Sequence, residues 1–81
     1  MSTQSTIHEF VQTILRRRGD ACPFGEGDSL VLSGRLDSLA VMEVAELLEA
    51  KFGVDFARRG FDPLDFDTIG EIAAVAVGDA K

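Results

Sequence analysis

Apolar side chains recur at helical spacing in three separate parts of this 81-residue chain. The first part runs from about Thr6 to Arg18, with apolar residues at i, i+3, i+4, i+7 and i+8. These residues are Ile7, Phe10, Val11, Ile14 and Leu15. Thr6 and Glu9 have the spacing of a capping box, although Ser5 or an earlier residue is an alternative cap. Gly19 is a suitable end for this helix.

A second helix is expected from Ser38 to about Phe52, with Gly53 after its last residue. Its inward face is Val41, Val44, Ala45, Leu48 and Phe52. A last helix opens at Thr68, which has capping-box spacing to Glu71. That helix carries Ile69, Ile72, Ala73 and Ala76. Val75 and Val77 would allow a short strand there, but the alanine content and the cap favour a helix.

Two connecting segments complete the chain. Gly19 to Asp37 is longer than most loops in a compact domain, a length typical of functional or disordered loops. Its apolar residues predict that it packs onto the core; they are Leu30, Val31, Leu32 and Leu36. Residues 54–66 are irregular until Asp62, which with Pro63 starts a short third helix. Three longer helices and one short helix predict an all-α fold, a small four-helix bundle, with residues 1–81 forming a single domain.

The net charge of the chain indicates which classes of partner it is suited to bind. Fourteen acidic residues and eight basic residues give a net charge of −6, which disfavours nucleic acid and anionic membranes. It favours proteins with basic docking patches, although solubility alone also accounts for it. No stretch approaches the roughly 20 apolar residues of a membrane span, and the N-terminal residues lack the regions of a signal peptide. We expect a cytoplasmic monomer, and the single Cys22 excludes an internal disulfide.

The inventory of reactive side chains does not suit an enzyme or a metal site. His8 is the only histidine, no third group completes a catalytic triad with it, and a surface position is the simpler interpretation. One histidine and one cysteine do not make a zinc site. Four acids near the last helix miss the spacing of a calcium-binding loop; they are Asp62, Asp65, Asp67 and Glu71. No glycine-rich phosphate loop is present.

The segment Gly34-Arg35-Leu36-Asp37-Ser38-Leu39 leads directly into the second, acidic helix. Serine at a helix N-terminus is a natural cap, and this position also favours an anion. A phosphodiester on Ser38 would therefore be well placed, and a flexible arm would project away from the bundle. Asp37 is harder to justify, because a carboxylate repels a neighbouring phosphate. The alternative is that Ser38 only caps the helix.

This segment resembles the phosphopantetheine attachment motif of the acyl and peptidyl carrier protein family. The resemblance covers nearly the whole chain, including the segment Phe66-Asp67-Thr68-Ile69. It implies that Ser38 carries 4'-phosphopantetheine and that Asp37 is among the residues that a phosphopantetheinyl transferase recognises. The arm would hold an acyl or aminoacyl group as a thioester, while enzymes perform the chemistry. The further partners would be a loading ligase and acyl-processing enzymes.

The resemblance also implies that partners dock on the second helix. Carried over to this sequence, the docking face is Leu39, Glu43, Glu46 and Glu49. Glutamates would steer a partner around an apolar contact at Leu39. An ordinary solvated helix face is the alternative. The Arg58-Arg59 pair adds positive charge near the expected interface.

A second Asp-Ser-Leu occurs at Asp28-Ser29-Leu30. The residues after it cannot begin a long helix before Gly34, so we interpret Asp28 and Leu30 as local capping and loop packing. Ser38 is therefore the predicted attachment point.

The details of the motif point to a specialised carrier. Two residues separate Gly34 from Asp37, and Ala40 follows Leu39. These features resemble stand-alone carriers, including those that partner with adenylating ligases, more than carriers of housekeeping fatty acid synthesis. The alternative function is an unmodified acidic helical domain that binds a protein independently of Ser38.

Overall fold

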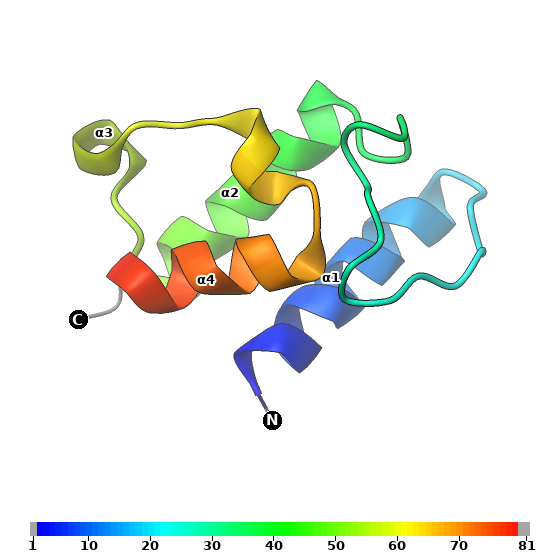
Figure 1. Cartoon of the computed structure of the whole chain (residues 1–81), viewed down its shortest axis with the longest axis horizontal. Helices are drawn as coiled ribbons and strands as arrows, with labels where there is room; N and C mark the ends of the chain where they lie inside the picture. Colours follow the sequence, from blue (N-terminus) through cyan, green and yellow to red (C-terminus); the bar gives the residue numbers. More distant parts are fainter. Residues whose placement is uncertain (1, 80–81) are drawn as a thin grey trace.

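The computed structural model describes residues 2–79, and within this range it contains α-helices and one 3-10 helix but no strand. The elements are α1 (Thr3–Arg17), α2 (Ser38–Phe52), α3 (Phe56–Arg59), the 3-10 helix η1 (Pro63–Phe66) and α4 (Ile69–Asp79). Figure 1 shows α1, α2 and α4 packed together, with α3 and η1 on the chain between α2 and α4. The predicted all-α fold, three longer helices and a short one, is confirmed. Residues 1, 80 and 81, which the single-domain prediction includes, lie outside the described residues.

The core lies between the three longer helices and η1. Each helix contributes a buried stripe: Ile7, Val11, Ile14 and Leu15 from α1, Ala40, Val41, Val44, Ala45 and Leu48 from α2, and Ile69, Ile72, Ala73, Val75 and Ala76 from α4. Phe66 of η1 is also fully buried. Phe10 and Phe52, both predicted on inward faces, are only partly buried and pack against the margin of this core. Since α4 continues as a helix through Val75 and Val77, the alternative of a short strand there is wrong.

Helix starts follow the capping residues. The Ser2 hydroxyl accepts a hydrogen bond from the Ser5 backbone N–H at 3.1 Å, so α1 begins at Thr3 and not at Thr6. The predicted Thr6–Glu9 capping box is therefore wrong, since the cap is an earlier residue. At α4 the Thr68 hydroxyl accepts from the Glu71 N–H at 3.1 Å, which confirms the predicted start.

The segment between α2 and α4 differs from the prediction. The short helix predicted at Asp62 is η1, a 3-10 helix in which the Asp62 side chain accepts a hydrogen bond from the Leu64 N–H. A further single turn, α3, lies in the part predicted to be irregular, because Asp55 caps it at the Arg58 N–H. A helix this short spans about one turn, so its residues cannot show the repeating apolar spacing by which a sequence predicts a helix.

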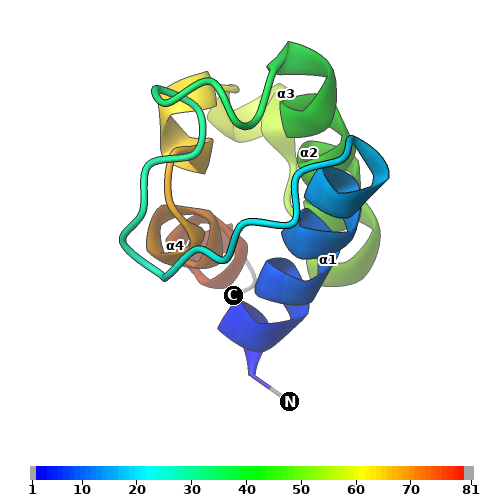
Figure 2. The same cartoon turned by 90° about the vertical axis from the view of Figure 1, so that its right-hand side faces the viewer.

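The long loop between α1 and α2 packs onto the bundle, as predicted. Phe24, Leu30 and Leu36 are buried in it. Val31 is partly buried, whereas Leu32 is 73% exposed, so the prediction is wrong for that residue. Figure 2 shows this loop passing the start of α4 and then η1 before it enters α2. No helix in the described part of the chain is both long and apolar enough to cross a bilayer.

Candidate functional site

Ser38 is exposed and is the first residue of α2. Its expected role as the helix cap is wrong, because the preceding residue takes that role. Asp37 has extended backbone angles, and its Oδ1 accepts from the Ala40 N–H at 2.9 Å. No hydrogen bond to the Ser38 hydroxyl is found within residues 2–79. The serine oxygen is therefore open to solvent at the positive end of the helix dipole.

Asp37 also forms an ion pair with Arg18, the residue that follows α1. Its Oδ2 lies 2.6 Å from Nη1 of Arg18. The hydrogen bond from Arg18, followed by that from the Ala40 N–H, lowers the pKa of the Asp37 carboxyl. Asp37 is thus an ionised carboxylate at neutral pH whose charge is offset by a guanidinium. This arrangement answers the objection that a carboxylate beside Ser38 would repel a phosphate, so the residues present fit the phosphodiester group.

The residues before Asp37 anchor the loop that leads into α2. Gly34 has φ of 85°, a left-handed conformation that favours glycine. Arg35 binds Asp20 with Nε to Oδ2 at 2.9 Å, and its guanidinium lies over the Phe24 ring. Leu36 is buried. Both residues between Gly34 and Asp37 therefore anchor the loop.

The predicted docking residues lie on one face of α2. At 100° per residue, positions 39, 43, 46 and 49 project within a single arc opposite the buried stripe. Leu39 is 67% exposed, and Glu46 and Glu49 are exposed. Glu43 is partly buried and pairs with Arg17 of α1 at 3.0 Å. Sequence reasoning missed Met42, which belongs to the same arc and is 51% exposed.

The match to known families agrees with this geometry. The family model described as "Phosphopantetheine attachment site" matches residues 5–76, most of the chain. The chain belongs to this family. It is a carrier protein and not an enzyme, and its cofactor is covalently attached 4'-phosphopantetheine. The family also implies that the carrier interacts with a phosphopantetheinyl transferase and with biosynthetic enzymes. No curated protein and no solved structure has significant similarity to the chain.

The second Asp-Ser-Leu of the carrier has a different environment. The Ser29 hydroxyl donates to Oδ1 of Asp67 at 2.8 Å. Asp28 accepts from the Gly25 N–H at 2.6 Å, and Leu30 is fully buried. The interpretation of Asp28 and Leu30 as capping and packing residues is confirmed, and Ser29 starts no helix.

Asp67 is the residue whose importance to the carrier the sequence analysis missed. Its Oδ1 accepts from the backbone N–H groups of Val31 and Leu32, both at 2.9 Å, as well as from Ser29. The Leu32 N–H is the largest of the hydrogen-bonding causes that lower the pKa of Asp67. Asp67 therefore ties the loop that leads to Ser38 to the start of α4. The clue in the sequence is the place of Asp67 in the segment Phe66-Asp67-Thr68-Ile69, directly before the residue that caps α4.

The other reactive side chains of the carrier form no site with Ser38. His8 is half-buried rather than a surface residue, since it stacks on Phe24 and its Nε2 lies 3.1 Å from the Phe24 carbonyl oxygen. Cys22 is an exposed loop thiol. Within residues 2–79 no three histidine, cysteine, aspartate or glutamate side chains gather as metal ligands would.

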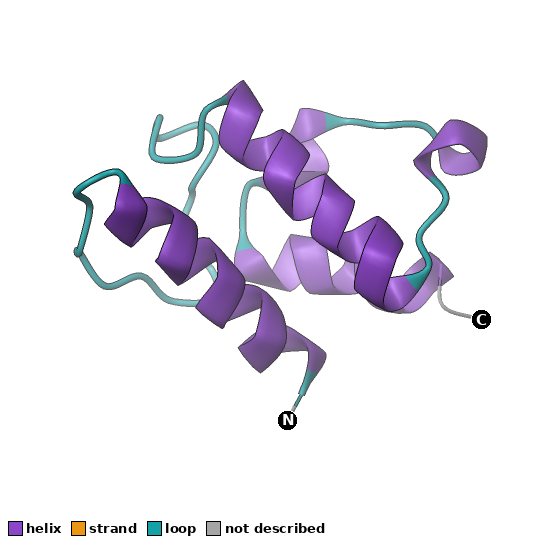
Figure 3. Ribbon diagram, turned by 180° about the vertical axis from the view of Figure 1, so that it is seen from behind, coloured by secondary structure: helices purple, strands orange, loops and turns teal. Residues whose placement is uncertain are grey.

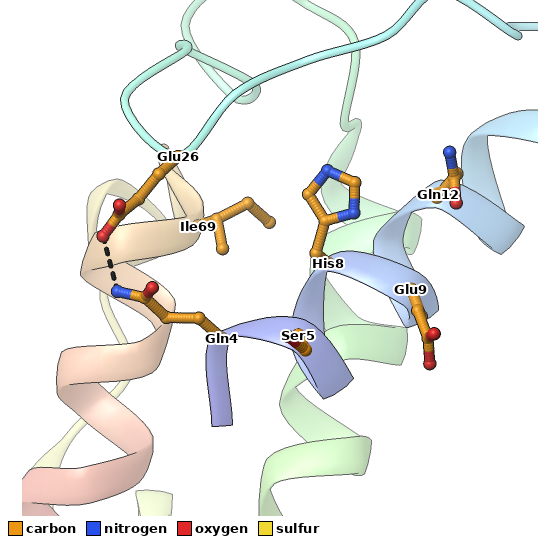
Figure 4. A pocket seen from close by; sticks show the side chains of 7 residues that line it. All are labelled: Gln4, Ser5, His8, Glu9, Gln12, Glu26 and Ile69. Carbon is orange, nitrogen blue, oxygen red and sulfur yellow. Dashed lines mark hydrogen bonds between the residues drawn. The ribbon is translucent and has the colours of Figure 1, made fainter. Parts of the chain in front are cut away.

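A pocket of about 430 Å³ lies between α1, the long loop and the start of α4. Its lining is Gln4, Ser5, His8, Glu9, Gln12, Glu26 and Ile69, and the Gln4 amide donates to Glu26 (Figure 4). None of these residues belongs to α2. The candidate site of this carrier is therefore an exposed helix end and its flank, and not a cavity.

Proposed function

We propose that Ser38 is the residue that carries the phosphopantetheine arm, and that residues 1–81 form one carrier domain. The observation that carries this proposal is the exposed hydroxyl of Ser38 at the first residue of α2, with Asp37 as the cap. A serine used as a cap would have its oxygen bound to a backbone N–H. The Ser38 oxygen accepts no such hydrogen bond from a described residue, whereas the Ser29 hydroxyl donates a hydrogen bond to Asp67.

The residues around Ser38 suit the modification. The Ser38 hydroxyl loses its proton and attacks phosphorus in the pyrophosphate of coenzyme A, which forms a phosphodiester while adenosine bisphosphate leaves. Asp37 holds the first turn of α2 in place, and Arg18 offsets part of the negative charge beside the new phosphodiester. Once attached, the arm carries an acyl or aminoacyl group as a thioester. Tethering raises the concentration of that cargo at each docked active site.

The partners proposed are a phosphopantetheinyl transferase, a loading ligase and acyl-processing enzymes, all docking on Leu39, Glu43, Glu46 and Glu49. The exposure of Leu39, Glu46 and Glu49 supports this face. The sequence from Gly34 to Ala40 favours a specialised pathway with an adenylating ligase over housekeeping fatty acid synthesis. The cytoplasmic location and the monomeric state stay predictions from the sequence.

The first prediction is tested by intact-mass measurement. Purified protein is incubated with coenzyme A, magnesium and a broad-specificity phosphopantetheinyl transferase, beside Ser38→Ala and Ser29→Ala variants. We expect the wild type and Ser29→Ala to gain one phosphopantetheine, and Ser38→Ala to gain none. Because Asp37 is the cap, Ser38→Ala should stay folded, with a stability change within about 0.5 kcal/mol.

A control carrier modified in parallel verifies the transferase. If the folded wild type gains no mass while that control does, the assignment of Ser38 is wrong. The chain would then fit an unmodified acidic domain that binds proteins through α2, and binding would be unaffected by Ser38→Ala.

A further inference from the structure

Two ion pairs join the end of α1 to the first half of α2. Arg18 Nη1 lies 2.6 Å from Asp37 Oδ2, and Arg17 Nη2 lies 3.0 Å from Glu43 Oε1. Figure 3 shows α1 and α2 side by side, with the end of α1 near the start of α2. Both pairs therefore place a guanidinium on the α1 side of Ser38.

The carboxylates further along α2 have no such partner. Glu46 and Glu49 are exposed, and neither forms an ion pair with any residue between 2 and 79. The acidic face is thus divided along the helix. Next to Ser38 its charge is offset by arginine, and beyond Glu43 it is free.

We propose that Arg17 and Arg18 determine which partners dock, because they mask Asp37 and Glu43 from cationic surfaces. This inference rests on the proposed attachment at Ser38. A partner with a uniformly basic patch is attracted by Glu46 and Glu49 alone, and must displace two arginines to reach the other acids. The best-fitting partner is an enzyme with cations opposite Glu46 and Glu49 and a neutral or acidic rim where its active site receives Ser38.

The geometry makes this masking reversible. The side chains of Arg17 and Glu43 are 62% and 32% exposed, and those of Arg18 and Asp37 are 31% and 57% exposed. Ion pairs this exposed are weak and are screened by salt. Masking should therefore act on the association rate of a charged partner at low salt, where electrostatic steering is strongest.

The test compares two double variants of equal net charge. Arg17→Gln with Arg18→Gln releases Asp37 and Glu43. Arg16→Gln with Lys51→Gln removes two exposed cations that pair with no described residue. Each double variant changes the formal net charge from −6 to −8, since two positive charges are lost. Folding of each is verified by its thermal unfolding.

The readout is kcat/KM for modification by a phosphopantetheinyl transferase with a basic docking surface, at roughly 0.02 M and 0.5 M salt. At low salt, the Arg17/Arg18 variant should be modified about threefold to tenfold faster than the Arg16/Lys51 control. This difference should vanish at high salt. Equal rates for the two variants, or a slower rate for the Arg17/Arg18 variant, would overturn the masking proposal.

A second readout does not depend on Ser38. A synthetic lysine-rich helical peptide is titrated into each unmodified protein, and the amide signals of α2 are followed by NMR. Tighter binding to the Arg17/Arg18 variant, with shifts that extend to residues 37–43, supports masking. The same affinity and the same shifts in both variants would refute it. Absence of modification in every protein, including the wild type, would instead count against Ser38 as the attachment point.

Discussion

Two carboxylates in this protein, those of Asp37 and Asp67, each form more than one structural contact. Asp37 accepts from the Ala40 N–H and pairs with Arg18. Asp67 accepts from two backbone N–H groups and from Ser29. In both cases hydrogen bonds favour the ionised form and lower the pKa of the carboxyl. At the residue scale, the path of the chain into Ser38 depends on these two acids.

Asp67→Asn should destabilise the fold in a pH-dependent way. Because the pKa of Asp67 is lowered on folding, its stabilising contribution is complete above the ordinary carboxyl value of about 3.9 and is lost as the pH falls through the folded value. The difference in unfolding free energy between wild type and variant should therefore be largest at neutral pH and shrink in acid. Urea denaturation across this pH range measures it.

Glu49→Gln is the control for that experiment, because the Glu49 side chain is exposed and forms no hydrogen bond with any described residue. Its stability should match the wild type at neutral pH. If Asp67→Asn were equally harmless, the tether between the loop and α4 would contribute nothing to folding.

At the scale of the element, both ends of α2 are determined by single residues. Asp37 caps its start, and Gly53 ends it with φ of 70°. A left-handed residue after the last helical turn is the usual stop signal, and glycine adopts it without a steric cost. The length of the proposed docking face therefore depends on residues that lie outside the helix.

Gly53→Ala should lower the unfolding free energy by about 1 kcal/mol, since a Cβ disfavours the left-handed conformation. Gly27→Ala is the matched control: both positions leave open space for a Cβ, but Gly27 does not have a positive φ. That control should be neutral or slightly stabilising. Chemical denaturation of both variants measures the difference, and equal effects would contradict a stop determined by φ.

At the scale of the whole molecule, one helix serves both the core and the surface. The buried stripe of α2 packs among α1, η1 and α4, while Leu39 is on the opposite side. Substitutions on the buried face of α2 should therefore change the stability of the fold, and substitutions on the exposed face should change the docking of partners.

Leu48→Ala and Leu39→Ala make that comparison with the same chemical change. Leu48 is fully buried, so its truncation should cost about 2–5 kcal/mol of stability. Leu39→Ala should change stability by less than about 0.5 kcal/mol yet raise the KM of the transferase. Thermal unfolding and modification kinetics of both variants check this. A large loss of stability for Leu39→Ala would remove the distinction between the two faces.

Much of the fold could be predicted from local patterns. Helical periodicity located α1, α2 and α4, because an amphipathic stripe needs only the spacing of apolar residues. The motif from Gly34 to Leu39 pointed to the family that the comparison then showed. Capping preferences were less decisive, since adjacent polar residues compete for one N–H group: Ser2 rather than Thr6, and Asp37 rather than Ser38.

The sequence by itself determined the helical class, the span of α2 and the family, because these depend on residues near one another in the chain. Only the tertiary structure paired Arg17 with Glu43, Arg18 with Asp37, and Asp67 with the backbone of the long loop. Such contacts join residues that are far apart in sequence and depend on how α1 and α4 pack against their neighbours. The division of the acidic face follows from that packing, whereas the free hydroxyl of Ser38 follows from local capping by Asp37.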